Sequence, residues 1–126
     1  MLLIDTDVII WYMRGSEKAS ALIDKQEPFS ISAVTYMELV QGMRNRTEFN
    51  RFRRMILSKD IAIIQISEEI SSRAIYYVEE YYLSHSLLIA DALIASTATD
   101  HGLKLLTGNA KHFRTEKDLD VQSFVP

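Results

Sequence analysis

Three carboxylates stand where the surrounding sequence favours burial. Asp5 follows a short apolar run, Glu38 is flanked by methionine and leucine, and Asp91 interrupts an alanine-rich segment. An unpaired carboxylate among apolar groups is costly, so each of these acids needs a partner. Convergence of all three on one divalent cation would supply that partner, because Mg²⁺ and Mn²⁺ prefer oxygen ligands.

A cation held by carboxylates suits hydrolysis of a phosphodiester bond. It orients or ionises the attacking water, neutralises phosphate oxygens and stabilises the leaving oxygen. The net charge of −3 argues against a protein that holds nucleic acid by bulk electrostatics. A divalent ion would overcome this deficit locally, because it converts an acidic cleft into a phosphate receptor.

Each acid also has a simpler interpretation. Asp5 and Asp91 could cap the helices that start beside them. Glu38 could form an internal ion pair with Arg44 or Arg73. The sequence leaves these alternatives open, although all three would have to hold at once to remove the need for a cation.

The length and composition predict a single globular domain over residues 1–126. Of these residues 48% are hydrophobic and 25% are charged, and none is cysteine. The lack of cysteine excludes a disulfide scaffold, an iron–sulfur cluster and a thiol nucleophile. No apolar run approaches the ~20 residues of a membrane span, so we expect a cytoplasmic protein that does not enter the membrane.

Short apolar strands separated by helices predict an α/β fold with a mostly parallel sheet. We expect four to five strands, at residues 2–4, 29–32, 61–64, 103–107 and 121–122, the first and third of them buried on both faces. About seven helices are expected, at residues 8–14, 16–25, 33–46, 47–59, 67–83, 87–101 and 109–113. Thr47 is the expected cap of the fourth helix. Ligands collect outside the carboxyl ends of the strands in such sheets, and Asp5 lies at one of these ends.

Four motifs, in a fixed order, give the chain a specific resemblance. They lie at residues 3–9 (LIDTDVI), 32–42 (SAVTYMELVQG), 90–98 (ADALIASTA) and 106–113 (LTGNAKHF). Each motif alone is weak, but together they span essentially the whole chain. The sequence resembles the PIN-domain ribonucleases, and more narrowly the VapC-type toxins of type II toxin–antitoxin systems.

The resemblance implies a PIN-like fold in which Asp5, Glu38 and Asp91 bind Mg²⁺ or Mn²⁺ and catalyse RNA cleavage. The implied enzyme is an endoribonuclease that uses metal-activated water and leaves 5′-phosphate and 3′-hydroxyl ends. A cognate antitoxin that fills the cleft, and a homodimer, are the implied protein partners. The tyrosine-rich helix at residues 67–83 agrees with a dimer, because its aromatic face is wider than a small core needs.

Four further residues are candidates for supporting roles. Asp7 lies in the first motif, and Thr107 and Asn109 lie in the last, where they would offer oxygen atoms. Many relatives have a fourth acid two or three residues beyond Asn109, whereas this chain has alanine, lysine and histidine there. His112 is either a solvated surface residue or a contact to the phosphate or the leaving group.

A cationic stretch lies between residues 44 and 59, with six Lys or Arg against one acid. Beside a metal cleft, such a stretch can follow an RNA backbone. The candidate RNA-binding residues are Arg44, Arg46, Arg51, Arg53 and Arg54. A solvated helix face, or a dock for an acidic antitoxin segment, is an equally good interpretation.

Two other functions are kept as alternatives. Asp5 and Asp7 also resemble the signature of haloacid-dehalogenase-like phosphatases, in which the first Asp is a phosphorylated nucleophile. Those enzymes need a lysine and a pair of acids after a later strand, and the short stretch beyond Thr107 does not supply that arrangement. The second alternative is a catalytically inactive PIN-like module that only binds a partner, although such a module has no reason to keep buried acids.

Overall fold

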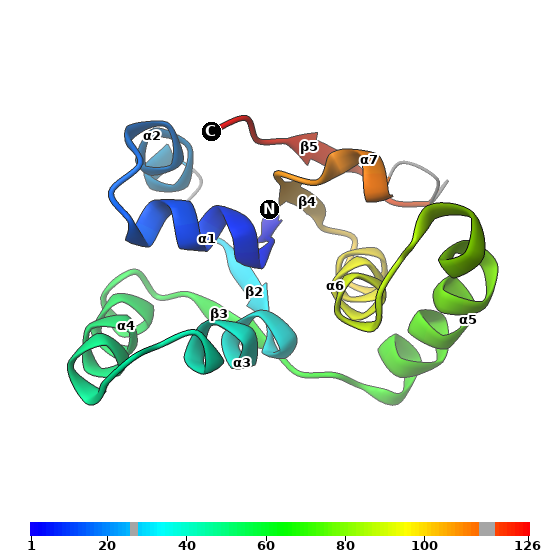
Figure 1. Cartoon of the computed structure of the whole chain (residues 1–126), viewed down its shortest axis with the longest axis horizontal. Coiled ribbons are helices and arrows are strands. Elements are labelled where there is room, and N and C mark those ends of the chain that lie inside the picture. The colour runs from blue at the N-terminus through cyan, green and yellow to red at the C-terminus, as the bar shows by residue number, and fades with distance from the viewer. Residues whose placement is uncertain (26–27, 114–117) are drawn as a thin grey trace.

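The computed structural model describes residues 1–25, 28–113 and 118–126 (Figure 1). Within them, five strands form one sheet in the order β3-β2-β1-β4-β5, and every pairing is parallel. The strands are β1 (Leu2–Ile4), β2 (Ser30–Ser32), β3 (Ala62–Ile64), β4 (Lys104–Thr107) and β5 (Val121–Ser123). The central strand is therefore β1, and its carboxyl end lies between those of β2 and β4.

Seven helices accompany the strands in the described part of the chain. They are α1 (Thr6–Met13), α2 (Glu17–Lys25), α3 (Ala33–Gln41), α4 (Arg46–Ser58), α5 (Glu68–His85), α6 (Ile89–Asp100) and α7 (Ala110–Phe113). The predicted α/β fold, with its parallel sheet and number of helices, is confirmed. Among these helices, none combines the length and the apolar character that crossing a membrane requires.

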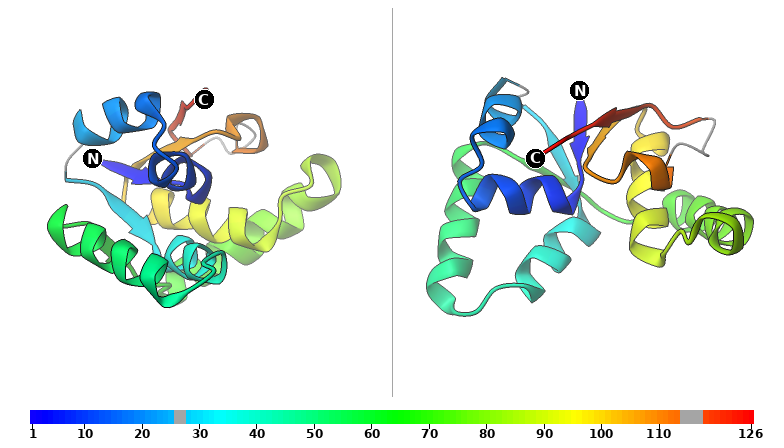
Figure 2. Two further views of the ribbon diagram at one scale, coloured as in Figure 1. Left: turned by 60° about the vertical axis from the view of Figure 1, so that its left-hand side comes forward. Right: turned by 45° about the horizontal axis from the view of Figure 1, so that its top comes forward.

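Helices cover both faces of the sheet, as Figures 1 and 2 show. On one face, α1, α2 and α4 pack over the side chains of Ile4 and Leu106. On the other face, α5 and α6 pack over Leu3 and Leu105. All four of these strand residues are fully buried, because successive side chains of a strand point to opposite faces and both faces are covered.

The boundary between the third and fourth helices differs from the prediction. The third helix was expected to reach Arg46, but α3 ends at Gln41 and Gly42 caps it. The cap of α4 is Asn45 rather than Thr47, because the Asn45 Oδ1 accepts the backbone N–H of Glu48 at 2.9 Å. Asparagine competes for backbone hydrogen bonds and so favours a helix start over a helix interior.

The third strand is not buried on both faces, contrary to the prediction. Ala62 is exposed, and Ile63 and Ile64 are half-buried. The reason is position, since β3 forms one edge of the sheet and pairs with β2 alone. An apolar run of this length cannot distinguish an edge strand from a central one.

The parallel pairing of β1 with β4 brings the ends of these two strands together. Ile4 lies opposite Leu106, and the next backbone N–H, of Asp5, donates to the Leu106 carbonyl oxygen at 2.9 Å. Asp5 and Thr107 therefore meet at the carboxyl edge of the sheet. Both α1 and α3 start at this same edge, directly after β1 and β2.

Candidate active site

Asp5 is buried at the junction of β1 and α1. Only 5% of its surface is exposed. Its Oδ1 accepts the backbone N–H of Thr6 at 2.7 Å, and its Oδ2 accepts the Thr107 hydroxyl at 2.7 Å. The capping interpretation of Asp5 is therefore confirmed, and the same side chain lies at the predicted end of the sheet.

Burial raises the pKa of Asp5 to about 7, and the neighbouring charge of Asp7 adds to this rise. The hydrogen bonds from Thr107 and Thr6 oppose the shift, and the charge of Asp91 reinforces it. Burial and like charges thus outweigh two donors aimed at the carboxylate. A cation beside Asp5 would offset both unfavourable effects.

Asp7 reaches across to the loop that follows β4. Its Oδ2 accepts the backbone N–H of Gly108 at 3.0 Å and the Asn109 side-chain amide at 3.3 Å. Its Oδ1 is buried and has no hydrogen-bond partner in the described residues. Burial also raises the pKa of Asp7. A Cβ at Gly108 would collide with the Asp7 carboxylate, so a larger residue here would force that carboxylate to move.

Glu38 is exposed on α3 rather than enclosed by apolar groups, so the prediction of a buried carboxylate here is wrong. Its Oε1 accepts the hydroxyl of Thr6 at 2.7 Å. The alternative ion pair with Arg44 is also wrong, since that guanidinium binds Glu48 instead. The contact with Thr6 ties Glu38 to the residue that follows Asp5.

Asp91 lies in the first turn of α6 and is half-buried. Its Oδ2 accepts the backbone N–H of Leu88 at 3.3 Å, so its capping interpretation is confirmed as well. The charge of Asp91 raises the pKa of Asp5 and the pKa of Asp7. The charge of Asp7 raises the pKa of Asp5 as well. Capping and electrostatic contact with the other acids therefore coexist in this residue.

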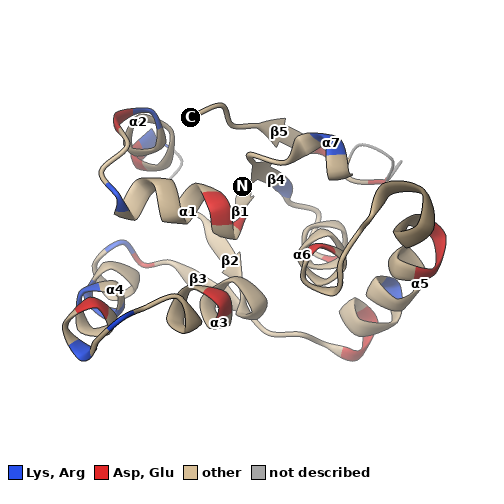
Figure 3. Cartoon of the chain, viewed as in Figure 1, with Lys and Arg blue, Asp and Glu red and all other residues tan. Residues whose placement is uncertain are grey.

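The elements that carry these acids contact one another. α3 packs against both α1 and α6. Figure 3 shows acidic residues at the start of α1, on α3 and on α6, around the middle of the view. In the described residues, no three His, Cys, Asp or Glu side chains lie close enough together to coordinate one metal ion. Direct ligation of one ion by Asp5, Glu38 and Asp91 together therefore stays a prediction.

The donor set nevertheless fits a divalent cation. Mg²⁺ in particular commonly takes one or two carboxylates directly and completes its shell with water and substrate phosphate. The unpartnered Asp7 Oδ1 and the raised pKa of Asp5 both indicate negative charge that the described residues leave uncompensated. Oxygen atoms are the only ligands that these side chains offer, which suits Mg²⁺ or Mn²⁺.

Comparisons with known proteins identify the family of this chain. A model of the PIN domain family matches residues 2–118. The chain is 34% identical over 130 aligned positions to Ribonuclease VapC10 of Mycobacterium tuberculosis, covering 100% of this chain and 96% of that protein. This chain belongs to the PIN-domain family. The resemblance drawn from four motifs is confirmed.

Solved structures share the PIN fold of this chain. A toxin–antitoxin complex from Klebsiella pneumoniae has a TM-score of 0.81 and 32% identity, over 98% of this chain and 97% of that chain. FitAcB from Neisseria gonorrhoeae has a TM-score of 0.73 and 25% identity, over 96% of both chains. VapBC-1 from nontypeable Haemophilus influenzae shares the fold alone, with a TM-score of 0.79 at 23% identity, over 97% of this chain and 96% of that chain.

The last motif of this PIN domain supports the acids through Thr107. This residue is fully buried, donates to Asp5 and accepts the backbone N–H of Asn109 at 3.0 Å. Asn109 contacts Asp7 as described above. His112 is half-buried on α7, and its backbone N–H donates to the Asn109 carbonyl oxygen at 2.9 Å. Thr107 and Asn109 thus contact the acids directly, whereas His112 shows only this backbone bond within residues 1–25, 28–113 and 118–126.

A groove of about 960 Å³ lies between α1, α3 and α4, and Glu38 is part of its wall. Of the five candidate RNA-binding arginines, Arg44 and Arg51 line it. The others point to different partners: Arg46 stacks on the ring of Phe49, Arg53 donates to the Tyr36 hydroxyl at 3.0 Å, and Arg54 is exposed. The cationic stretch is therefore not one continuous surface.

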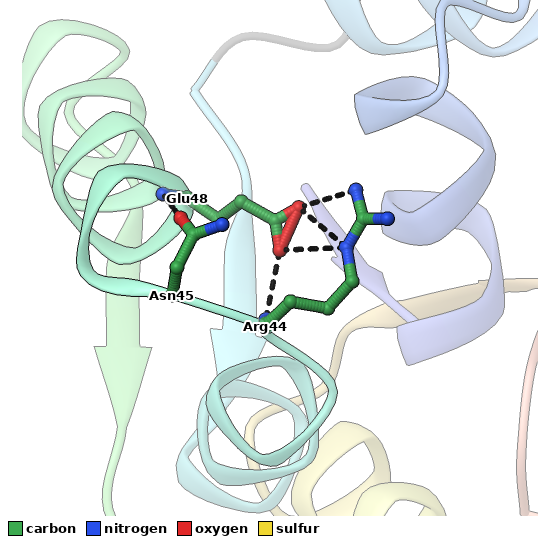
Figure 4. Close-up of polar contacts among 3 residues, drawn as sticks. All are labelled: Arg44, Asn45 and Glu48. Atoms are coloured by element: carbon green, nitrogen blue, oxygen red, sulfur yellow. Dashed lines mark hydrogen bonds and ion pairs between the residues drawn. The ribbon is translucent and has the colours of Figure 1, made fainter.

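Arg44 precedes α4 and is held by Glu48, as Figure 4 shows. Its guanidinium donates to both carboxylate oxygens, with an Nη2–Oε2 distance of 3.0 Å, and its backbone N–H donates to Oε1 at 2.8 Å. These bonds lower the pKa of Glu48. The Arg44 side chain remains 84% exposed, so it keeps most of its surface free for an anion at the groove.

Sequence reasoning missed Thr6. The only available signal was a hydroxyl placed between two acids in the first motif, and a helix cap explained it equally well. Its contact with Glu38 joins residues 32 positions apart, which no local pattern encodes.

Proposed function

We propose that this chain is a divalent-metal-dependent endoribonuclease and the toxin of a type II toxin–antitoxin pair. It would act in the cytoplasm as a single domain over residues 1–126. Support comes from membership of the PIN-domain family, whose VapC ribonucleases generally depend on divalent metals. The observation that carries the proposal is Asp5, buried at the end of β1 within the electrostatic reach of Asp7 and Asp91.

The residues proposed to hold Mg²⁺ or Mn²⁺ are Asp5, Glu38 and Asp91. When bound, the ion supplies an activated water and positive charge beside the scissile phosphate. Asp5 has a pKa of about 7, so near neutral pH its proton is easily exchanged for a cation. Burial and the neighbouring acids disfavour the ionised form of Asp5 in the metal-free protein. A bound cation would stabilise this same ionised form.

The surrounding donors orient the carboxylates for this task. Thr107 holds one oxygen of Asp5 through its hydroxyl and the Thr6 backbone N–H holds the other, so the carboxylate is restrained from turning. Gly108 and Asn109 hold one oxygen of Asp7 in the same way, and its other oxygen stays without a partner in the described residues. Fixed carboxylates lose little entropy on ligation, which favours catalysis by preorganised charge.

The groove beside Glu38 is the proposed path of the RNA. Arg44 and Arg51 line it. Arg51 is suited to phosphate, because a guanidinium pairs with phosphate oxygens through two parallel hydrogen bonds, whereas Arg44 would offer phosphate only the N–H groups that Glu48 leaves free. Arg46, Arg53 and Arg54 are proposed as outer contacts only. His112 is proposed to remain a surface residue.

A cognate antitoxin is the proposed protein partner, since a similar solved structure is a toxin–antitoxin complex from Klebsiella pneumoniae. The same groove could receive an antitoxin segment that competes with RNA. A homodimer is proposed through α5, where Ile75, Tyr76 and Leu83 are exposed. Large apolar side chains exposed together on one helix commonly mark a protein interface.

Family membership favours this proposal over a haloacid-dehalogenase-like phosphatase. An RNA-cleavage assay distinguishes this proposal from the inactive PIN-like module, which would bind a partner but cleave no RNA. The test is cleavage of RNA by the antitoxin-free protein with Mg²⁺ or Mn²⁺, and with EDTA. Asp91→Asn should lower the cleavage rate ~100-fold or more, because it removes a charge from the metal site.

The matched control is Asp100→Asn, which alters an exposed carboxylate at the other end of α6. This variant should cleave RNA as the wild type does. Equal rates for the wild type and Asp91→Asn would reject the assigned site. Cleavage that persists in EDTA would reject the metal dependence.

A further inference from the structure

The hydroxyl of Thr6 lies between two of the acids and has no role in the mechanism above. The backbone N–H of Thr6 donates to Asp5 Oδ1 at 2.7 Å, and its side-chain hydroxyl donates to Glu38 Oε1 at 2.7 Å. One residue therefore holds the carboxylate at the end of β1 and the carboxylate on α3. These two acids come from different elements and have no other shared contact in the described residues.

A second hydroxyl, that of Thr35, extends the hydrogen bond between Thr6 and Glu38 into a chain. Thr35 is fully buried, and its hydroxyl oxygen lies 3.0 Å from the Thr6 hydroxyl oxygen. An ionised Glu38 carboxylate can only accept, and the Thr6 hydroxyl carries a single proton. Thr6 therefore donates to Glu38 and accepts from Thr35. In such a chain each hydrogen bond polarises and strengthens the next.

Glu38 depends on this chain for its orientation. The residue is exposed, and a free glutamate side chain has considerable rotamer freedom to lose. In the described part of the protein, Thr6 is the sole group that bonds the Glu38 carboxylate. Without the hydroxyl, the carboxylate would be released from the site into the groove that it lines.

We propose that Thr6 is a positioning residue that holds the Glu38 carboxylate beside Asp5 for a divalent cation. The inference rests on the proposed function for the location of the site. We assign the Thr6 hydroxyl no contact with the substrate or the reacting atoms, and its effect on the cation is exerted through Glu38. Groups that orient metal-binding carboxylates in this way typically contribute 10–100-fold to metal affinity.

The first test is the affinity for Mn²⁺, measured by titration calorimetry on EDTA-treated full chain. Thr6→Val keeps the shape but removes the hydroxyl, and its Kd should rise about 10–100-fold. Thr6→Ser keeps the hydroxyl and should bind Mn²⁺ within about threefold of the wild type. Thr97→Val is the matched control: its buried hydroxyl donates to the Leu93 carbonyl oxygen at 2.7 Å, and its loss should leave the Kd unchanged.

The second test needs neither metal nor RNA. Thermal unfolding in EDTA is compared for Thr6→Val, Glu38→Ala and the double variant. The two residues share one hydrogen bond, so the sum of the single losses in Tm should exceed the loss of the double variant by roughly 3 °C. Additive shifts would show that the residues do not interact, and would overturn the inference.

The results also separate this inference from the proposed function. A Thr6→Val protein that binds Mn²⁺ as tightly as the wild type overturns the inference, and so does a wild type that does not bind Mn²⁺. RNA cleavage by such proteins would leave the ribonuclease assignment intact. Conversely, Mn²⁺ binding that depends on Thr6 in a protein that cleaves no RNA supports the inference and rejects the assigned activity.

Discussion

Replacing Asp5 with asparagine should stabilise the metal-free protein at and above neutral pH, while removing its response to divalent cations. Burial raises the pKa of Asp5 from 3.8 to about 7, and the charge of Asp7 contributes to this rise. Asparagine is neutral at every pH and nearly isosteric. It therefore removes the cost of a buried negative charge without opening a cavity.

The sign follows from proton linkage. The folded protein binds the Asp5 proton more tightly than the unfolded chain does, since the folded pKa is the higher one. The stability from this proton is complete below pH 3.8 and is lost as the pH rises through about 7. Roughly three pH units, at about 1.4 kcal/mol each, amount to about 4 kcal/mol at pH 8.

Urea unfolding in EDTA at several pH values between 4 and 8 measures this effect. The free energy of unfolding of Asp5→Asn should exceed that of the wild type by an amount that is smallest at pH 4 and approaches about 4 kcal/mol at pH 8. Asp120→Asn, at an exposed position just before β5 and outside the ion pairs seen in the described residues, serves as the control and should follow the wild type. With saturating Mn²⁺, the wild type should gain stability at pH 8 and Asp5→Asn should not.

A difference between Asp5→Asn and the wild type that stays constant with pH would refute the reasoning. It would mean that the carboxylate is ionised throughout the range, so that burial and like charges do not dominate its environment. A destabilised Asp5→Asn protein at pH 8 would point the same way. In that case the hydrogen bonds to the ionised form would outweigh the burial.

Each of three further predictions concerns a single residue. Arg51→Ala should weaken RNA binding and reduce the slope of log K against log salt concentration by about 0.7, if the side chain meets one phosphate of a single strand; an unchanged slope would remove Arg51 from the RNA path. Gly108→Ala should cost about 1–3 kcal/mol in urea unfolding, because the new methyl group displaces the Asp7 carboxylate; a stability equal to wild type would show that Asp7 is free to move. Leu83→Glu should shift a dimer to a monomer in light scattering, since this leucine is 92% exposed on α5; Leu57→Glu, at a 72% exposed site on α4, is the control that should remain dimeric.

The sequence was sufficient for the parts of the fold that depend on local pattern. The apolar run of β1 is buried as predicted, because a strand covered on both faces needs apolar residues on both faces. The apolar run at residues 2–4 correctly placed Asp5 directly after the first strand, at the carboxyl edge of the sheet. The parallel pairing of β1 with β4 explains why Thr107, at the end of the neighbouring strand, contacts that carboxylate.

The environment of Glu38 was not predictable in the same way. Its sequence neighbours Met37 and Leu39 suggested burial, but successive residues of a helix point in directions about 100° apart. Leu39 is buried and Met37 is 52% exposed, so Glu38 lies at the margin of the buried stripe. Only the packing of α3 against α1 brings its carboxylate to Thr6.

Helix capping alone does not account for Asp5, even though the structure confirms the cap. A capping side chain contributes about 1 kcal/mol, and its hydrogen bond to the ionised form lowers the pKa of the carboxyl group. The start of a helix favours negative charge as well. The pKa of Asp5 is nevertheless raised to about 7, so the cost of the buried charge at pH 8, about 4 kcal/mol, exceeds the contribution of the cap. A serine at position 5 would cap α1 without the cost of a buried charge. It would not place a negative charge at the end of β1. The charge therefore points to a second role, and the cation binding that we propose for Asp5 would turn this cost into affinity.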